Sequence, residues 1–286
     1  MTRAQSVSDN GREREARRKP ELAIRVASAA VLATLALGAT IFKPWTFLIL
    51  VTVGSLIVAW EWGQLTRGNG FDRTAVVSGV SVAAIAVLVF LGRTDLALLV
   101  LAAGAVAIGL TAVSAGLSVW PFAGLLYAAL PAAALMYLRG DPLWGATAVL
   151  FLFAVAWTTD TASYAAGRLI GGPKLAPRIS PNKTWSGFVV GALTPALIGY
   201  AFAAALKETS TVKLALVSVV LALGCQMGDL LESALKRRFG AKDASHMIPG
   251  HGGLLDRIDG LLLAAVLAAL IALRDPGSPG RGLLMW

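Results

Sequence analysis

Acidic, basic and hydroxyl side chains gather in one stretch near the C-terminal end of the chain. Asp229, Glu232, Ser233, Lys236 and Arg237 occupy positions i, i+3, i+4, i+7 and i+8. These spacings place the five side chains along one face of a helix. Because a charge inside a bilayer is costly, such a face must meet water or the interior of a bundle. A ladder of ion pairs on a helix entering water would also explain the charges, but not the residues that follow.

A glycine-rich loop follows this stretch and leads into the last apolar segment. Pro249 and three glycines in this loop are incompatible with a regular helix. Because glycine lets a ligand come close to the backbone, the N–H groups of such a loop can bind an anion. Asp256 and Asp259 then fall in the first turn of a helix, on the same side. One aspartate there would only cap the helix. Two aspartates beside Arg257, opposite Asp229, predict ligands for Mg²⁺, which favours one or two carboxylates together with substrate phosphates.

A second polar loop, residues 160–185, combines turn-forming residues, hydroxyl groups and cations. Its last part reads Ser180-Pro-Asn-Lys183-Thr184. Lys, Ser and Thr side chains of this kind can bind phosphate, although the chain contains no P-loop motif. Basic loops beside a membrane also arise from the sorting of positive charge alone. Phosphate binding by this loop is therefore supported only in combination with the glycine-rich loop.

The stretch from Ser233 to Asp259 resembles the signature of the phosphatidate cytidylyltransferases, also called CDP-diacylglycerol synthases. Its 27 residues read Ser-x-Leu-Lys-Arg-x4-Lys-Asp-x-Ser-x2-Ile-Pro-x-His-Gly-Gly-Leu-x-Asp-Arg-Ile-Asp. The segments 160–168, 180–185 and 226–229 are also similar to motifs of this family, so that the resemblance covers roughly residues 150–275. One position departs from the pattern, because Ser186 stands where the family usually has glutamate after the tryptophan.

This resemblance implies transfer of a cytidylyl group from CTP to phosphatidate, which gives CDP-diacylglycerol and pyrophosphate. It implies Mg²⁺ as a cofactor, with a second, monovalent cation left open. The expected metal ligands are Asp229, Asp256 and Asp259. The expected catalytic residues are Asp229, Asp256, Lys236, Lys242 and His251. The expected substrate-binding residues are Ser180, Lys183, Thr184, Ser233, Arg237, Asp243, Gly252, Gly253 and Arg257.

The composition indicates that these residues are positioned by membrane helices. Of the 286 residues, 57% are hydrophobic and 14% are charged, and the mean hydropathy is +0.72. Soluble domains are less apolar and about 25% charged, so a water-soluble globular enzyme is excluded. The only cysteine, Cys225, excludes an intrachain disulfide and a cysteine-rich metal cluster.

About nine apolar segments are long enough to cross a bilayer core of about 30 Å. Their continuous apolarity favours helices over a barrel, and lipid permits no other fold. The expected fold class is therefore all-α, a polytopic transmembrane helical bundle of about nine spans. The segments are 23–42, 44–60, 75–91, 96–120, 122–138, 143–159, 186–206, 213–228 and 258–273.

The distribution of Lys and Arg predicts the orientation. With nine spans and a cytoplasmic N-terminus, 18 of the 25 Lys and Arg residues fall on the inner side and 7 on the outer side, as positive-inside sorting requires. The loops 160–185 and 229–257 then lie at the cytoplasmic face of a bacterial inner membrane. We expect a disordered basic tail over 1–22, N-terminal helices over 23–140, a catalytic region over 141–275 and a C-terminal tail over 276–286.

The expected partners are CTP and phosphatidate, without nucleic acid, and a homodimer is left open. Two alternatives also fit a polytopic membrane protein with a charged inner face. A related lipid kinase that uses CTP would release CDP instead of pyrophosphate. A transporter would show flux without nucleotide turnover, but the first six expected spans carry no charge in their middle.

Overall fold

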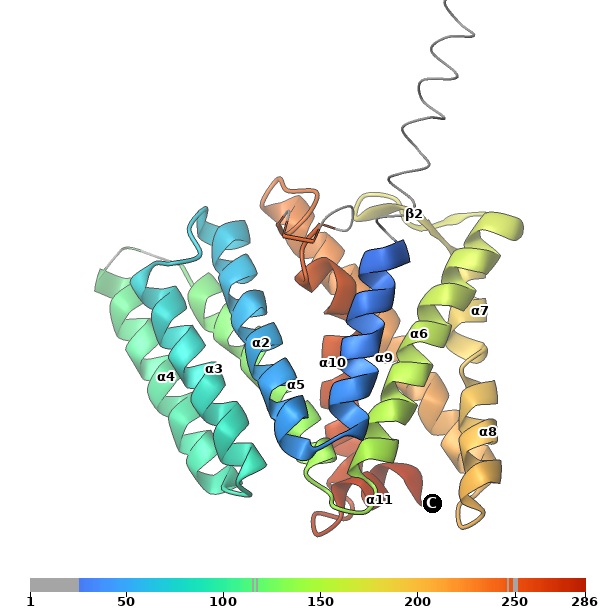
Figure 1. The fold of residues 1–286 in the computed structure, drawn as a ribbon. Coiled ribbons are helices and arrows are strands. Elements are labelled where there is room, and N and C mark those ends of the chain that lie inside the picture. Colours follow the sequence, from blue (N-terminus) through green and yellow to red (C-terminus); the bar gives the residue numbers. More distant parts are fainter. Residues whose placement is uncertain (1–25, 115, 117, 246, 249–251) are drawn as a thin grey trace, which may run out of the picture.

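The structure, a computed structural model, describes residues 26–114, 116, 118–245, 247–248 and 252–286. Most successive helices run in alternating directions between the two ends of a bundle (Figure 1). The predicted tail over 1–22 and the predicted catalytic residue His251 lie outside the described residues. The helices are Val26–Ile41, α2 (Pro44–Arg67), α3 (Arg73–Phe90), α4 (Thr94–Ser114), α5 (Trp120–Arg139), α6 (Gly145–Leu169), α7 (Trp185–Leu193), α8 (Ala196–Leu206), α9 (Thr211–Arg238), α10 (Leu255–Ala272) and α11 (Pro279–Leu284).

Every apolar segment identified in the sequence coincides with a helix or with a pair of helices. Within the described residues, seven helical segments are long and apolar enough to cross a membrane. One of them joins α7 and α8, which are interrupted at Pro195 because proline cannot donate a helical hydrogen bond. The helical, integral-membrane character of the chain is therefore confirmed. The count of nine spans and the cytoplasmic N-terminus stay predictions.

Helices α9 and α10 lie close together because small residues face each other at their crossing. A Cβ atom added to Gly228 of α9 would lie 2.6 Å from the carbonyl oxygen of Asp259. A Cβ atom added to Gly260 of α10 would lie 2.9 Å from the carbonyl oxygen of Cys225. Contacts of this type let two backbones approach in a membrane bundle. They bring Asp229 and Asp259 onto neighbouring turns of the two helices.

The two polar loops are shorter than the sequence suggested. Helix α6 continues to Leu169, so much of the first expected loop is helical. Helix α9 continues to Arg238, which confirms the helical spacing predicted for Asp229 to Arg237. The remainder of the first loop contains an antiparallel hairpin of β1 (Lys174–Ala176) and β2 (Ser180–Thr184). The hairpin and the loop before α10 lie at the same end of the bundle, and α11 lies at the other (Figure 1).

Residues 276–286, expected as a tail, contain α11 and close the end of the bundle opposite the hairpin. The side chain of Asp141, between α5 and α6, is 3% exposed. It accepts hydrogen bonds from the Ser278 hydroxyl and from the backbone N–H of Gly280. Leu283 and Leu284 are fully buried. The last residues are therefore part of the packed core.

Candidate active site

Three carboxylates from three helices form an acidic group near the hairpin. Asp160 of α6, Asp229 of α9 and Asp259 of α10 interact electrostatically with one another. Lys183 of β2 reaches into this acidic group, with its Nζ 2.5 Å from Asp229 Oδ2. The Gly228 contact described above accounts for the closeness of Asp229 and Asp259. Asp160, which was seen only as part of a motif, joins the two predicted ligands.

Asp256 belongs to a different cluster. Lys236 Nζ lies 2.7 Å from both Asp256 Oδ1 and Glu232 Oε2, and the two carboxylate side chains are 4% and 1% exposed. Asp256 also accepts hydrogen bonds from the backbone N–H groups of Ala244 and Gly253. Its carboxylate is thus directed at the loop before α10. The cluster of Glu232, Lys236 and Asp256 is a buried ion-pair network that holds this loop against α9.

The acidic group and the predicted trio share two carboxylates, those of Asp229 and Asp259. Within the described part of the chain, no three Asp, Glu, His or Cys residues form a cluster that could hold a metal unaided. Mg²⁺ does not require one, since it usually binds one or two carboxylates, substrate phosphates and water. Asp229 and Asp259 match that donor set. Both oxygens of Asp256 accept hydrogen bonds, as those of Asp229 do from Lys183 and Ser233. Metal-binding carboxylates are commonly hydrogen-bonded in this way, so the ligand role of Asp256 stays a prediction.

The predicted residues of the hairpin segment have structural partners. Thr184 caps α7, because its Oγ1 accepts a hydrogen bond from the backbone N–H of Gly187 at 3.2 Å. Ser186, at the position where the family pattern has glutamate, donates to the carbonyl oxygen of Gly171. Ser180 is half-buried at the start of β2.

Arg237 ties the hairpin to α9. Its Nε donates to the carbonyl oxygen of Ile179 at 3.2 Å, and its side chain is otherwise exposed. Ser233 Oγ lies 3.5 Å from Asp229 Oδ1, at the limit of a hydrogen bond. Lys242 and Asp243 are exposed in the loop before α10. Of these four residues, Ser233 contacts the acidic group, and among the described residues Arg237, Lys242 and Asp243 form no ion pair with it.

The glycines before α10 have backbone reasons for their identity. Gly252 has φ +82°, a conformation that side chains rarely adopt. A Cβ atom on Gly253 would lie 2.5 Å from Oε1 of Glu61. The second observation reveals a residue that the sequence reading missed. Glu61 of α2 is 0% exposed and accepts hydrogen bonds at the start of α10.

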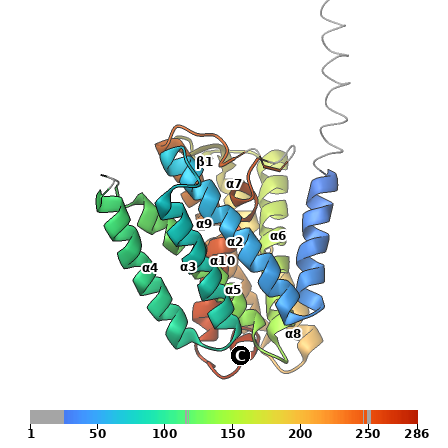
Figure 2. The same cartoon turned by 60° about the vertical axis from the view of Figure 1, so that its left-hand side comes forward.

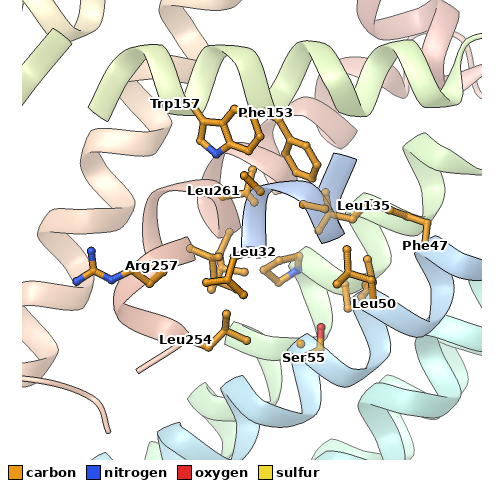
Figure 3. A pocket seen from close by; sticks show the side chains of 18 of the residues that line it. Leu32, Phe47, Leu50, Ser55, Leu135, Phe153, Trp157, Leu254, Arg257 and Leu261 are labelled. Carbon is orange, nitrogen blue, oxygen red and sulfur yellow. The ribbon is translucent and has the colours of Figure 1, made fainter. Parts of the chain in front are cut away.

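An apolar pocket of about 340 Å³ lies beside the site. Its walls come from the helix Val26–Ile41 and from α2, α5, α6 and α10, with side chains such as Leu32, Phe47 and Trp157. Figure 2 shows the helix Val26–Ile41 on the outside of the bundle. Arg257 lies at the edge of the pocket, and its guanidinium points away from the apolar side chains (Figure 3). It also interacts electrostatically with Asp160, so one residue borders both the pocket and the acidic group.

Comparison with known proteins places these features in a family. Residues 23–273 match the model of the cytidylyltransferase family. A phosphatidate cytidylyltransferase of Brucella suis is 41% identical over 257 residues, which cover 87% of this chain and 92% of the relative. Proteins of the same name from Rickettsia bellii and Staphylococcus saprophyticus are 35% identical over 163 residues and 39% identical over 140 residues. The Rickettsia match covers 52% of this chain and 67% of that relative, and the Staphylococcus match 49% and 54%.

Proposed function

The chain belongs to the cytidylyltransferase family, and we propose that it transfers a cytidylyl group from CTP to phosphatidate. An oxygen of the lipid phosphate attacks the α-phosphorus of CTP and forms a new P–O bond. The bond between the α-phosphorus and the bridging oxygen of the β-phosphate breaks, and pyrophosphate leaves. The products are CDP-diacylglycerol and pyrophosphate. The observation that carries the proposal is the position of Arg257, between an apolar pocket and a carboxylate-lined polar site.

The two substrates differ in the surroundings that they require, and the site offers both. Phosphatidate has apolar chains and an anionic headgroup, so it suits a pocket with apolar walls and a cation at its rim. We place its chains in the pocket and its phosphate beside Arg257. CTP would then approach from the end of the bundle that carries the hairpin, where Lys183, Lys242 and Arg237 supply positive charge.

We assign Asp229 and Asp259 as the carboxylates that would hold Mg²⁺, with Asp160 as the third acidic neighbour. A bound Mg²⁺ supplies charge neutralisation at the phosphate oxygens. Lys183 pairs with Asp229, and we place the triphosphate beside its ammonium group. Reactions of this class depend chiefly on positioning and electrostatic stabilisation. The hairpin and the α9–α10 contact provide rigid support for the positioning of the substrates and for the electrostatic stabilisation.

A direct assay tests the proposal. Purified protein in phospholipid nanodiscs is incubated with phosphatidate and CTP labelled at the α-phosphate, with Mg²⁺ or with a chelator. We expect labelled CDP-diacylglycerol and an equal amount of pyrophosphate, only with Mg²⁺. Release of CDP with a phosphorylated lipid would instead identify the kinase alternative. Solute flux without nucleotide turnover would identify a transporter.

The position of the site relative to the membrane is a further part of the proposal. We place the hairpin end at the cytoplasmic face of a bacterial inner membrane, because Lys and Arg are concentrated there and CTP is a cytoplasmic nucleotide. Cysteine substitution of the exposed residues Lys174 and Lys207 tests this in intact cells after Cys225 is changed to serine. A membrane-impermeant thiol reagent should label position 207 and spare position 174. Labelling of position 174 alone would reverse the orientation.

A further inference from the structure

Glu61 is a fully buried carboxylate with a specific set of donors. Its Oε1 accepts hydrogen bonds from the Ser245 hydroxyl at 2.5 Å and from the backbone N–H of Leu254 at 2.9 Å. Its Oε2 accepts from the backbone N–H of Leu255 at 2.6 Å. The donors lie more than 180 residues away in the sequence. A carboxylate that is 0% exposed is costly to bury unless it is well hydrogen-bonded, so this arrangement needs a reason.

The reason lies at the first turn of α10. The residue that precedes this helix, Leu254, has an apolar side chain and forms no cap, although the first N–H groups of any helix lack partners within it. Glu61 supplies the missing acceptor from α2. Its negative charge also meets the positive end of the helix dipole, which favours a carboxylate there. Glu61 therefore acts as an N-cap that comes from another helix.

The sequence leaves space for this cap at Gly253. A Cβ atom at that position would lie between 2.5 and 3.0 Å from the carboxyl atoms of Glu61. Any side chain larger than hydrogen would displace the carboxylate from the backbone N–H groups. Gly253, which we first assigned to phosphate binding, thus has a second role that the geometry explains directly.

We infer that Glu61 is a positioning residue for the active site. It fixes the start of α10, and the first two turns of this helix carry Arg257 and Asp259, to which the proposed reaction assigns the lipid phosphate and the metal ion. Glu61 touches neither substrate in this arrangement. The inference rests on the proposed function for its effect on catalysis, but the anchoring of α10 is a property of the protein without substrate or metal.

The variant Glu61→Gln tests the inference while keeping the size of the side chain. Its NH₂ group would face at least one of the backbone N–H groups that the carboxylate now accepts from, so the cap is weakened without leaving a cavity. In protein without metal and substrate, we expect faster amide hydrogen exchange at Leu254 and Leu255, and unchanged exchange in the middle of α9. In the assay, kcat per folded molecule should fall about 10- to 100-fold, as for other supporting residues of active sites. KM for CTP should change less than threefold.

Three further variants control the experiment. Glu208→Gln makes the same change at an exposed residue after α8, and should alter neither exchange nor kcat. Ser245→Ala removes one donor and leaves both backbone hydrogen bonds, so its effect on kcat should be smaller than that of Glu61→Gln. Gly253→Ala should reproduce the faster exchange at Leu254 and Leu255 by displacing Glu61.

Two results would overturn the inference. One is an active Glu61→Gln protein with unchanged exchange at the start of α10 and unchanged kcat. The other is a lower yield of folded protein with unchanged kcat per folded molecule, which would make Glu61 a purely structural residue. Absence of activity in the wild-type protein would contradict the proposed function, whereas the exchange measurement would still decide whether Glu61 anchors α10.

Discussion

Asp256 and Asp259 are three residues apart on α10, but their carboxylates have different neighbours. The Asp256 carboxylate is buried against Lys236 and receives backbone hydrogen bonds from the preceding loop. The Asp259 carboxylate interacts with Asp229 on α9 and with Asp160 on α6. Asp256 is thus held in a buried ion pair, whereas Asp259 lies among other carboxylates, where we have proposed the cation site.

Replacing each of these aspartates by asparagine separates the two roles. Asp259→Asn should lower kcat more than about 100-fold, since supporting residues of metal sites already account for 10- to 100-fold, and should leave the melting temperature in detergent nearly unchanged. Asp256→Asn should lower the free energy of unfolding by about 1–3 kcal/mol, because Lys236 loses a buried charged partner. Thermal unfolding and the CTP assay, run on both variants, check this. Equal losses of stability in the two would contradict the distinction.

Lys183 provides a prediction for substrate binding. Lys183→Ala removes the cation that pairs with Asp229, and we expect KM for CTP or for phosphatidate to rise at least about tenfold, the effect of one lost charge-assisted contact. Lys174→Ala is the matched control, because Lys174 is an exposed residue of β1 across from Thr184 in the same hairpin. Unchanged KM values for both substrates in the Lys183 variant would remove it from the binding site.

The sequence pattern predicted part of this site and missed the rest for physical reasons. Helical spacing showed that Asp229 and the aspartates of α10 occupy faces that can meet. Spacing does not show which donors reach a side chain, so Asp256 and Asp259 looked equivalent. Glu61 went unnoticed because its partners follow it by nearly 200 residues. A charge between Trp60 and Trp62, at the end of an apolar segment, was the available signal.

At the scale of elements, Asp141 shows how a connection between helices is held. Burial raises the pKa of the Asp141 carboxyl, but hydrogen bonds from Ser278 and from backbone N–H groups outweigh this effect and lower the pKa below 3.8. A group whose pKa is lower in the folded protein stabilises the fold above its unfolded pKa. That stabilisation is lost as the pH falls through the folded pKa.

Asp141→Asn should therefore remove a pH-dependent part of the stability. Near neutral pH we expect the variant to lose about 1–3 kcal/mol of unfolding free energy, because a charged acceptor of buried hydrogen bonds is removed. The difference in melting temperature between wild type and variant should stay constant from pH 6 down to about pH 4 and shrink as the pH falls further, below the ordinary aspartate pKa of 3.8. Asp95→Asn, at an exposed aspartate, should show a small difference at every pH. A constant, large difference for Asp141→Asn would contradict the explanation.

The helices themselves were largely predictable, whereas their ends were not. Long, continuously apolar segments in lipid must form helices, and every such segment identified in the sequence coincides with a helix or a pair of helices. The apolar segment that ends at residue 159 predicted too early an end for α6, which continues to Leu169. The charged stripe after residue 228 was predicted to be helical, and α9 confirms this by continuing to Arg238. The β1–β2 hairpin contains only three and five residues, too few for a strand pattern to be recognised beside Pro181 and Asn182.

At the scale of the whole molecule, the pocket behind the helix Val26–Ile41 relates the site to the surrounding bilayer. Gly54 of α2 lines this pocket, and a Cβ atom there would make only an ordinary contact, 3.8 Å from Leu254 Cδ2. Its replacement can therefore narrow the pocket without forcing the helices apart.

Gly54→Leu should raise KM for phosphatidate with long chains by about tenfold, a cost similar to that of one misfit group in an apolar pocket. KM for phosphatidate with six-carbon chains and KM for CTP should stay within threefold of the wild-type values. Gly109→Leu makes the same change on α4, where a Cβ atom meets open space, and should leave all three constants unchanged. An equal rise for both lipids would indicate a distorted site instead of a narrowed pocket.

The position of that outer helix has a consequence for product release if the lipid chains occupy the pocket as proposed. Chains behind the helix Val26–Ile41 would have no favourable route through water, so the liponucleotide would leave sideways into the bilayer while its enlarged headgroup follows along the surface. Departure of the finished molecule would then depend on the fluidity of the surrounding lipid. Cooling the membrane below its melting transition would slow the enzyme more than the same cooling slows it in detergent.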